Sequence, residues 1–123
     1  MIRSAVAAAL FVLLLPDISL AADAAAGEKV FARCKICHTV QAGGANTVGP
    51  NLHGVFGRKA GSADGFSYSA AMKDSGITWD DETVAKYLRD PRGAIPGNKM
   101  AFPGIKNEEE IANLLAYLHQ ATQ

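Results

Sequence analysis

Apolar residues recur at helical spacing near the start of the region that follows residue 22. Gly27, Val30, Phe31 and Cys34 occupy positions i, i+3, i+4 and i+7, which lie on one face of an α-helix. Asp23 precedes this stripe and can cap its first turn. The pattern predicts a helix over residues 24–34, and the glycine inside it indicates a close crossing with a second helix.

A second apolar stripe lies near the C-terminus and consists of Ile111, Leu114, Leu115 and Leu118. Its spacing predicts a terminal helix. The helix is expected to begin at Asn107, with Glu110 placed to complete a cap. His119 falls off the stripe, so we expect its ring to face solvent.

The middle of the chain predicts shorter helices separated by loops. One helix is expected over residues 68–74, and another from about Thr78 to Arg89, where Thr78 and Asp81 resemble a capping box. Asp90-Pro91 should end the second helix. Residues 39–63 and 92–106 are rich in glycine and proline and are expected to be loops. The chain is therefore expected to be all-α.

The first 22 residues have the layout of a signal peptide. A short basic start is followed by an apolar run from Ala5 to Leu15, then Pro16 and small residues. An uncleaved membrane anchor is the alternative, but the run is shorter than the about 20 residues that span a bilayer. The expected organisation is a signal peptide over residues 1–22, with an approximate cleavage site, and one domain over residues 23–123.

Charge and size limit the choice of partners only weakly. The chain has 123 residues and a formal net charge of zero. Acidic residues lie at 80–82 and 108–110, whereas a basic cluster is expected near residues 34–38 and 95–100. The basic cluster consists of Arg33, Lys35, Arg92, Lys99 and Lys106. Such a separation would give a dipole that steers docking, although an ordinary solvated surface would give the same pattern.

The sequence Cys34-Lys35-Ile36-Cys37-His38 has the spacing that attaches a c-type haem. Each thiol can add across one haem vinyl group, and the following histidine is then held against the iron. Methionine on the other face raises the reduction potential, and Met100 is the candidate. The Pro50 carbonyl can accept the other ring N–H of His38, although a plain turn proline would look the same.

The two cysteines have other possible uses, a disulfide or a thioredoxin-type redox pair. The redox pair should open a helix after a strand in a βαβ unit, and no strand-like run precedes Cys34. Structural zinc would need two more ligands at matched spacing, whereas only His53 and His119 remain. A haem enzyme or gas sensor with an open iron, and a docking protein with a redox-inert haem, are the rival functions.

The chain resembles class I cytochrome c, of the soluble bacterial cytochrome c2 or c-550 type, which is itself close to mitochondrial cytochrome c. The resemblance covers essentially all of the region after the signal peptide. The segments that carry it are residues 27–31, 34–40, 49–54, 57–58, 76–79, 87–88, 95–100, 104–106 and 114–118. It implies a small all-α cytochrome c fold, in which the terminal helices cross and short helices and loops surround one covalent haem.

The resemblance also implies roles for single residues. Cys34 and Cys37 would form the thioethers, with His38 and Met100 as axial ligands of the iron and Pro50 receiving the His38 hydrogen bond. Gly27 and Phe31 would meet Leu114 and Tyr117 where the terminal helices cross. The remaining haem contacts would be Arg58, Tyr68 and Trp79 at the propionates, Tyr87 near the methionine sulfur, and Asn98 closing the propionate side.

The function implied by the resemblance is single-electron transport, without enzyme activity. The expected donor is a bc-type quinol-oxidising complex, and the acceptor a terminal oxidase or another redox protein. A periplasmic monomer would dock transiently at the membrane surface through a ring of basic residues, Lys35, Arg92, Lys99 and Lys106. The expected cofactors are one heme c and its iron, and no nucleic acid is expected among the partners.

Overall fold

The computed structural model describes residues 9–13 and 21–123. In these residues all regular elements are helices, and the only bridge between extended segments is an isolated antiparallel pair, Lys59 and Thr78. The all-α expectation is therefore confirmed. Most of the expected signal peptide, residues 1–8 and 14–20, lies outside the described residues. The helices are α1 (Ala24–Phe31), α2 (Ala70–Lys73), α3 (Asp81–Arg89), α4 (Pro91–Ala94) and α5 (Glu108–Ala121).

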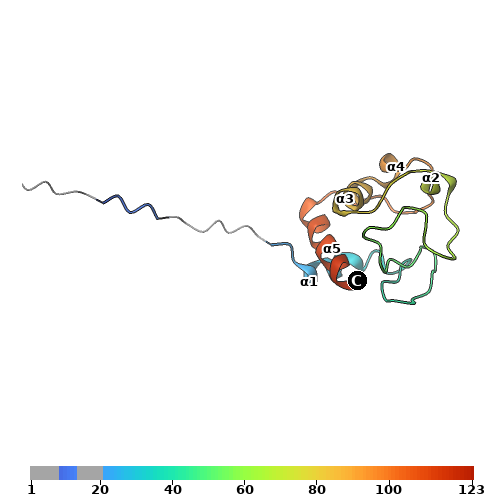
Figure 1. The fold of residues 1–123 in the computed structure, drawn as a ribbon, viewed down its shortest axis with the longest axis horizontal. Coiled ribbons are helices and arrows are strands. Elements are labelled where there is room, and N and C mark those ends of the chain that lie inside the picture. Colours follow the sequence, from blue (N-terminus) through green and yellow to red (C-terminus); the bar gives the residue numbers. More distant parts are fainter. Residues whose placement is uncertain (1–8, 14–20) are drawn as a thin grey trace, which may run out of the picture.

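The two terminal helices, α1 and α5, pack against each other (Figure 1), and Gly27 lies where they approach. A Cβ built on Gly27 would be 1.9 Å from the Asn113 carbonyl oxygen and 2.9 Å from the Cβ of Tyr117. The Phe31 and Tyr117 rings pack beside it with their centroids 5.2 Å apart. Only glycine permits this approach of the two backbones, so the predicted close crossing is confirmed.

The N-cap residues of the terminal helices are those predicted, but Glu110 does not complete a capping box, because its side chain pairs with Arg33. Helix α1 is also shorter than predicted. The Asp23 side chain accepts from the amides of Ala25 and Ala26, and the Asn107 side chain accepts from the amide of Glu110. α1 ends at Phe31, and turns continue to Cys37. The cysteines therefore lie on the turns after the helix rather than on its last turn.

Helix α3 begins later than predicted from the sequence. The N-cap is Asp80, which forms a capping box with Thr83, so the prediction of a box between Thr78 and Asp81 is wrong. Thr78 and Trp79 are instead held extended against the loop, where the Trp79 amide donates to the Arg58 carbonyl. This pairing keeps Thr78 out of the helix.

Helix α4 lies in a segment that was expected to be loop. Asp90 caps it by accepting from the Gly93 amide, and Pro91 occupies its first position. Proline has no backbone N–H, but an N–H at the first position of a helix has no partner within the helix anyway, and the fixed φ of proline suits that position. Asp90-Pro91 therefore ends α3 and also begins the next helix.

The core consists of two clusters of buried side chains that meet. One joins the terminal helices through residues such as Phe31, Ile105 and Leu114, and the other lies around Trp79, Val84 and Tyr87. The long loop between α1 and α2 is fixed to the C-terminus by a bond from the Gly54 amide to the Thr122 carbonyl. None of the described helices is long and apolar enough to cross a membrane.

Candidate functional site

A cavity of about 470 Å³ lies between the two core clusters and reaches the turn that carries the two cysteines. Its volume is within the range of small-molecule and cofactor sites. Nine of the ten predicted site residues line it. They are Cys34, Cys37, His38, Pro50, Arg58, Tyr68, Trp79, Tyr87 and Met100. Residues far apart in the sequence therefore share one largely apolar cavity.

His38 is oriented by the loop that passes over it. Its Nδ1 lies 2.8 Å from the Pro50 carbonyl oxygen. A carbonyl only accepts, so Nδ1 carries the proton and Nε2 is left with a lone pair that a metal can take. Burial lowers the pKa of His38, and the Pro50 contact opposes this only in part. The ring is therefore neutral at neutral pH, which is the form that binds metals.

Gly49 allows the loop to lie flat against that ring. A Cβ at this position would be 2.4 Å from Cε1 of His38. The Cys37 carbonyl accepts from the Gly49 amide at 2.8 Å and from the Thr47 hydroxyl at 2.7 Å. These bonds fix the loop to the cysteine turn and hold His38 between them.

Both cysteines are free thiols in the described chain, so the structure does not contain the disulfide that was the alternative use of this pair. Burial raises the pKa of the Cys34 thiol to about 11, although the nearby Arg33 opposes the shift. Both thiols lie at the cavity wall beside His38. Among the described residues no group of three or more His, Cys, Asp or Glu could hold a metal ion, so the zinc alternative gains no support.

Arg58 and Tyr68 bring polar groups to the cavity. The Arg58 guanidinium donates to the carbonyls of Asn51 and His53 at 3.2 and 3.1 Å. The Tyr68 hydroxyl accepts from the Ala63 amide at 3.1 Å, so its own proton remains able to donate. Both groups suit an anionic substituent such as a carboxylate.

Tyr87 and Asn98 are joined by a hydrogen bond. Burial raises the pKa of Tyr87 to about 12, so its hydroxyl stays protonated, and it donates to Oδ1 of Asn98 at 3.2 Å. Asn98 is the one predicted site residue that is absent from the cavity lining. Its polar atoms face the backbone and Tyr87 instead.

Several lining residues were not predicted. They include the apolar loop side chains of Val55, Phe66 and Phe102, together with Met72 of the short helix α2. Loop residues have no periodic spacing, so their sequence positions carry no signal of a shared face. Together they surround the polar groups with a largely dry wall, which strengthens electrostatic interactions inside.

The residues present fit a haem. An imidazole nitrogen and a thioether sulfur, both ligands that haem iron takes, line one cavity, and the two thiols lie beside the imidazole. Polar groups for the carboxylates of a macrocycle come from Arg58 and Tyr68. This donor set therefore fits a covalently attached haem.

The charges are less separated than the sequence suggested. Arg33, at the cavity, forms a two-pronged pair with Glu110 at 3.2 Å, and Arg89 pairs in the same way with Glu108. The expectation that acidic residues lie apart from the basic cluster is therefore wrong for Glu110, whereas Glu108 pairs with Arg89, which is not a member of that cluster. Of the predicted basic ring only Lys99 lines the cavity, where its Nζ donates to the Ser67 carbonyl.

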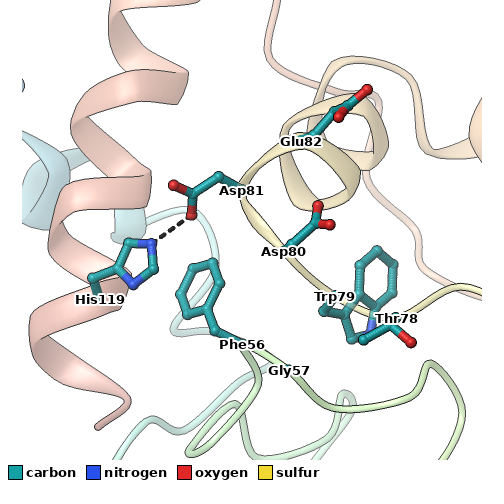
Figure 2. A pocket seen from close by; sticks show the side chains of 8 residues that line it. All are labelled: Phe56, Gly57, Thr78, Trp79, Asp80, Asp81, Glu82 and His119. Carbon is teal, nitrogen blue, oxygen red and sulfur yellow. Dashed lines mark hydrogen bonds and ion pairs between the residues drawn. The ribbon is translucent and has the colours of Figure 1, made fainter.

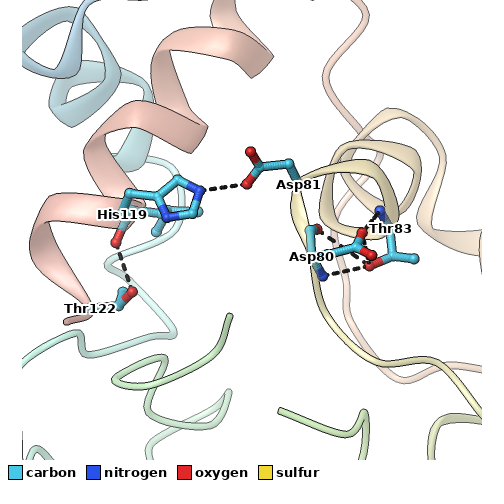
Figure 3. A network of polar contacts seen from close by, with 6 residues as sticks. Asp80, Asp81, Thr83, His119 and Thr122 are labelled. Atoms are coloured by element: carbon cyan, nitrogen blue, oxygen red, sulfur yellow. Dashed lines mark hydrogen bonds and ion pairs between the residues drawn. The ribbon is translucent and has the colours of Figure 1, made fainter. Parts of the chain in front are cut away.

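A second, shallower hollow lies between the start of α3 and the end of α5 (Figure 2). His119 stacks on Phe56 with the ring centroids 3.8 Å apart and pairs with Asp81 (Figure 3). The predicted solvent-facing His119 is only partly right, because 38% of its side chain is exposed. No cysteine or methionine lines this hollow, so it lacks the side chains expected to bind a haem.

Comparison with known proteins gives a consistent result. The family profile described as Cytochrome c matches residues 24–122. A cytochrome c2 from Blastochloris viridis is 51% identical over 100 residues, which cover 81% of this chain and 79% of that protein. A cytochrome c-550 from Bradyrhizobium diazoefficiens is 54% identical over 97 residues, covering 79% and 71%.

A solved structure has the same fold. The cytochrome cH from Methylobacterium extorquens superposes with a TM-score of 0.75 at 49% identity, covering 80% of this chain and 98% of that one. The expected fold class is therefore confirmed along almost the whole of that structure.

Proposed function

This chain belongs to the class I cytochrome c family, and we propose that it is a soluble electron carrier whose iron is bound by His38 and Met100. Members of this family carry electrons and are not enzymes, and membership implies a covalently bound c-type haem. The observation that supports the proposed ligands is their placement on one cavity with both thiols.

When bound, the haem supplies an iron that gains or loses one electron. The chain's residues set the conditions for that exchange. The Pro50 carbonyl holds the proton on Nδ1 of His38 and so leaves Nε2 for the iron. The lining is largely apolar, and a methionine ligand favours a high reduction potential.

The polar groups are proposed to hold the haem carboxylates. Arg58 is fixed by two loop carbonyls before any ligand arrives, so its guanidinium loses little freedom on binding. Tyr68 and Trp79 line the same cavity. Asn98 was expected to help here, but all its side-chain hydrogen bonds are made within the chain.

The proposed route of the electron is from a bc-type complex to a terminal oxidase or other redox protein, after export to the periplasm. A basic N-terminal start and an apolar run support the export signal over residues 1–22. The exposed lysines at 35 and 99 near the cavity support transient docking at a negatively charged site on a membrane complex. Redox encounters of this kind bury little surface and release quickly.

The test is the oxidation of the reduced protein by membranes that contain the oxidase, followed as salt is raised. The rate should fall steeply, because screening weakens attraction between exposed charges. Lys99→Glu should slow oxidation at low salt much more than Lys59→Glu, an equal charge change at an exposed residue outside the cavity lining. Rates independent of both salt and Lys99 would contradict docking through this face.

A further inference from the structure

Asn98 uses every polar atom of its side chain within the chain. Its Nδ2 donates to the carbonyls of Pro91 and Ile95 at 2.8 and 2.9 Å. Its Oδ1 accepts from the amide of Met100 at 2.9 Å and from the hydroxyl of Tyr87 at 3.2 Å. One half-buried side chain therefore makes four hydrogen bonds, all of them with other residues.

These bonds join three parts of the fold. Pro91 and Ile95 are the first residue and the C-cap of α4, and Tyr87 is on α3. A helix of four residues has little stability of its own, so the bonds from Nδ2 help to hold α4 in place. The same side chain then fixes the backbone nitrogen of Met100, two residues further on.

The position of that nitrogen decides where the Met100 side chain begins. Methionine is flexible, with three rotatable side-chain bonds, so a fixed backbone limits where its sulfur can reach. Met100 and Tyr87 both line the cavity, whereas Asn98 does not. The hydrogen bonds of Asn98 therefore link it to the cavity through Met100 and Tyr87.

We propose that Asn98 is a positioning residue that holds Met100 toward the cavity and so strengthens the bond between its sulfur and the iron. This inference rests on the proposed function, in which Met100 is the ligand. It gives Asn98 a different role from the contact with the haem carboxylates that the resemblance implied. No proton or electron transfer by Asn98 is involved.

The test is a titration of the ferric holoprotein with imidazole, whose nitrogen replaces the methionine sulfur on the iron. Asn98→Ala should bind imidazole at least about tenfold more tightly than the unaltered protein, since loss of several hydrogen bonds weakens the competing ligand. Asn98→Asp keeps the oxygen acceptor and loses the two N–H donors, so its affinity for imidazole should lie between those of the unaltered protein and Asn98→Ala. This variant also provides the test if the alanine variant does not accumulate.

Asn51→Ala is the matched control. Its Nδ2 likewise donates to two carbonyls, those of Gln41 and Gly44, and its Oδ1 accepts from the amide of His53. It therefore fixes a loop on the His38 side with the same kind of bonds. This variant should lower the midpoint of thermal unfolding without the tenfold gain in imidazole affinity.

The outcomes separate this inference from the proposed function. Absence of the far-red sulfur-to-iron band in the unaltered ferric protein would overturn methionine ligation itself. If that band is present but both Asn98 variants bind imidazole within about twofold of the unaltered protein, the positioning role is wrong. An equal gain in affinity for Asn51→Ala would overturn it too, because the effect would then be general destabilisation.

Discussion

The carbonyl oxygen of Asn113 on α5 would lie 1.9 Å from a Cβ placed on Gly27 of α1. The crossing of the terminal helices is thus built on the absence of one side chain. Because α1 leads directly into the cysteine turn, the position of this crossing also fixes one wall of the cavity.

Gly27→Ala should lower the free energy of unfolding by about 1–3 kcal/mol, the usual range for overpacking a core. Helix propensity alone predicts the opposite sign, since alanine is favoured over glycine by about 1 kcal/mol. Urea unfolding of the holoprotein measures the difference. Ala25→Gly, at an exposed position of the same helix, is the control. It should lower the free energy of unfolding only by the difference in helix propensity between alanine and glycine. A stabilised Gly27→Ala protein would contradict the crossing.

Gly49→Ala should displace the ring of His38, because the added Cβ would be 2.4 Å from Cε1. Gly49 is not among the glycines with positive φ, so the backbone itself accepts alanine and only the clash remains. We expect less protein with covalent haem and a changed visible spectrum, measured on equal amounts of cells. Ala42→Ser, at an exposed site in the same loop, should leave both unchanged.

The cap of α3 should contribute to the acid limb of stability. Hydrogen bonds from the backbone and side chain of Thr83 lower the pKa of Asp80. The unfolded chain therefore binds this proton more tightly, so the contribution is complete above the ordinary aspartate pKa of about 3.9 and is lost as pH falls through the lowered value. Asp80→Asn should flatten the fall in stability between about pH 5 and pH 2.

Urea unfolding at each pH measures this effect. Glu82→Gln removes one carboxylate from the same turn without removing the cap and serves as the control. Acid limbs of equal slope for Asp80→Asn and the unaltered protein would show that the cap has no such role.

His119 should link α5 to α3 more through its ring than through its charge. It stacks on Phe56 and pairs with Asp81, but both members of the pair are partly exposed. Exposed pairs contribute about 0.2–1 kcal/mol, and a stacked aromatic pair about 0.5–1.5 kcal/mol. His119→Ala should therefore lower the midpoint of thermal unfolding more than Asp81→Asn does. A larger loss for Asp81→Asn would reverse this ranking.

The terminal helices could be predicted because their stripes and caps are local. Spacing placed Phe31 and Leu114 on inner faces, and the side chains of Asp23 and Asn107 need only the next turn to act as caps. The start of α3 could not be placed in this way. Thr78 and Asp80 are both good N-caps, and Asp80 is used because Thr78 pairs with Lys59, a loop residue 19 positions earlier.

Some parts of the candidate site could be predicted from the sequence and others could not. The motif from Cys34 to His38 is contiguous, so the sequence alone indicates its chemistry. Asn98 was assigned by resemblance to the haem carboxylates, whereas its bonds depend on where α4 and Tyr87 lie. The wall formed by residues such as Phe66 has no spacing rule, because loops bring its members together one at a time.

The central claim, that one haem iron is held by His38 on one face and Met100 on the other, is tested most directly by the far-red absorption of the purified ferric protein and its Met100→Ala variant. The account predicts a weak sulfur-to-iron band in the unaltered protein and no such band in the variant, with the covalent haem retained in both. A band that is missing from the unaltered protein, or that survives in Met100→Ala, would contradict it.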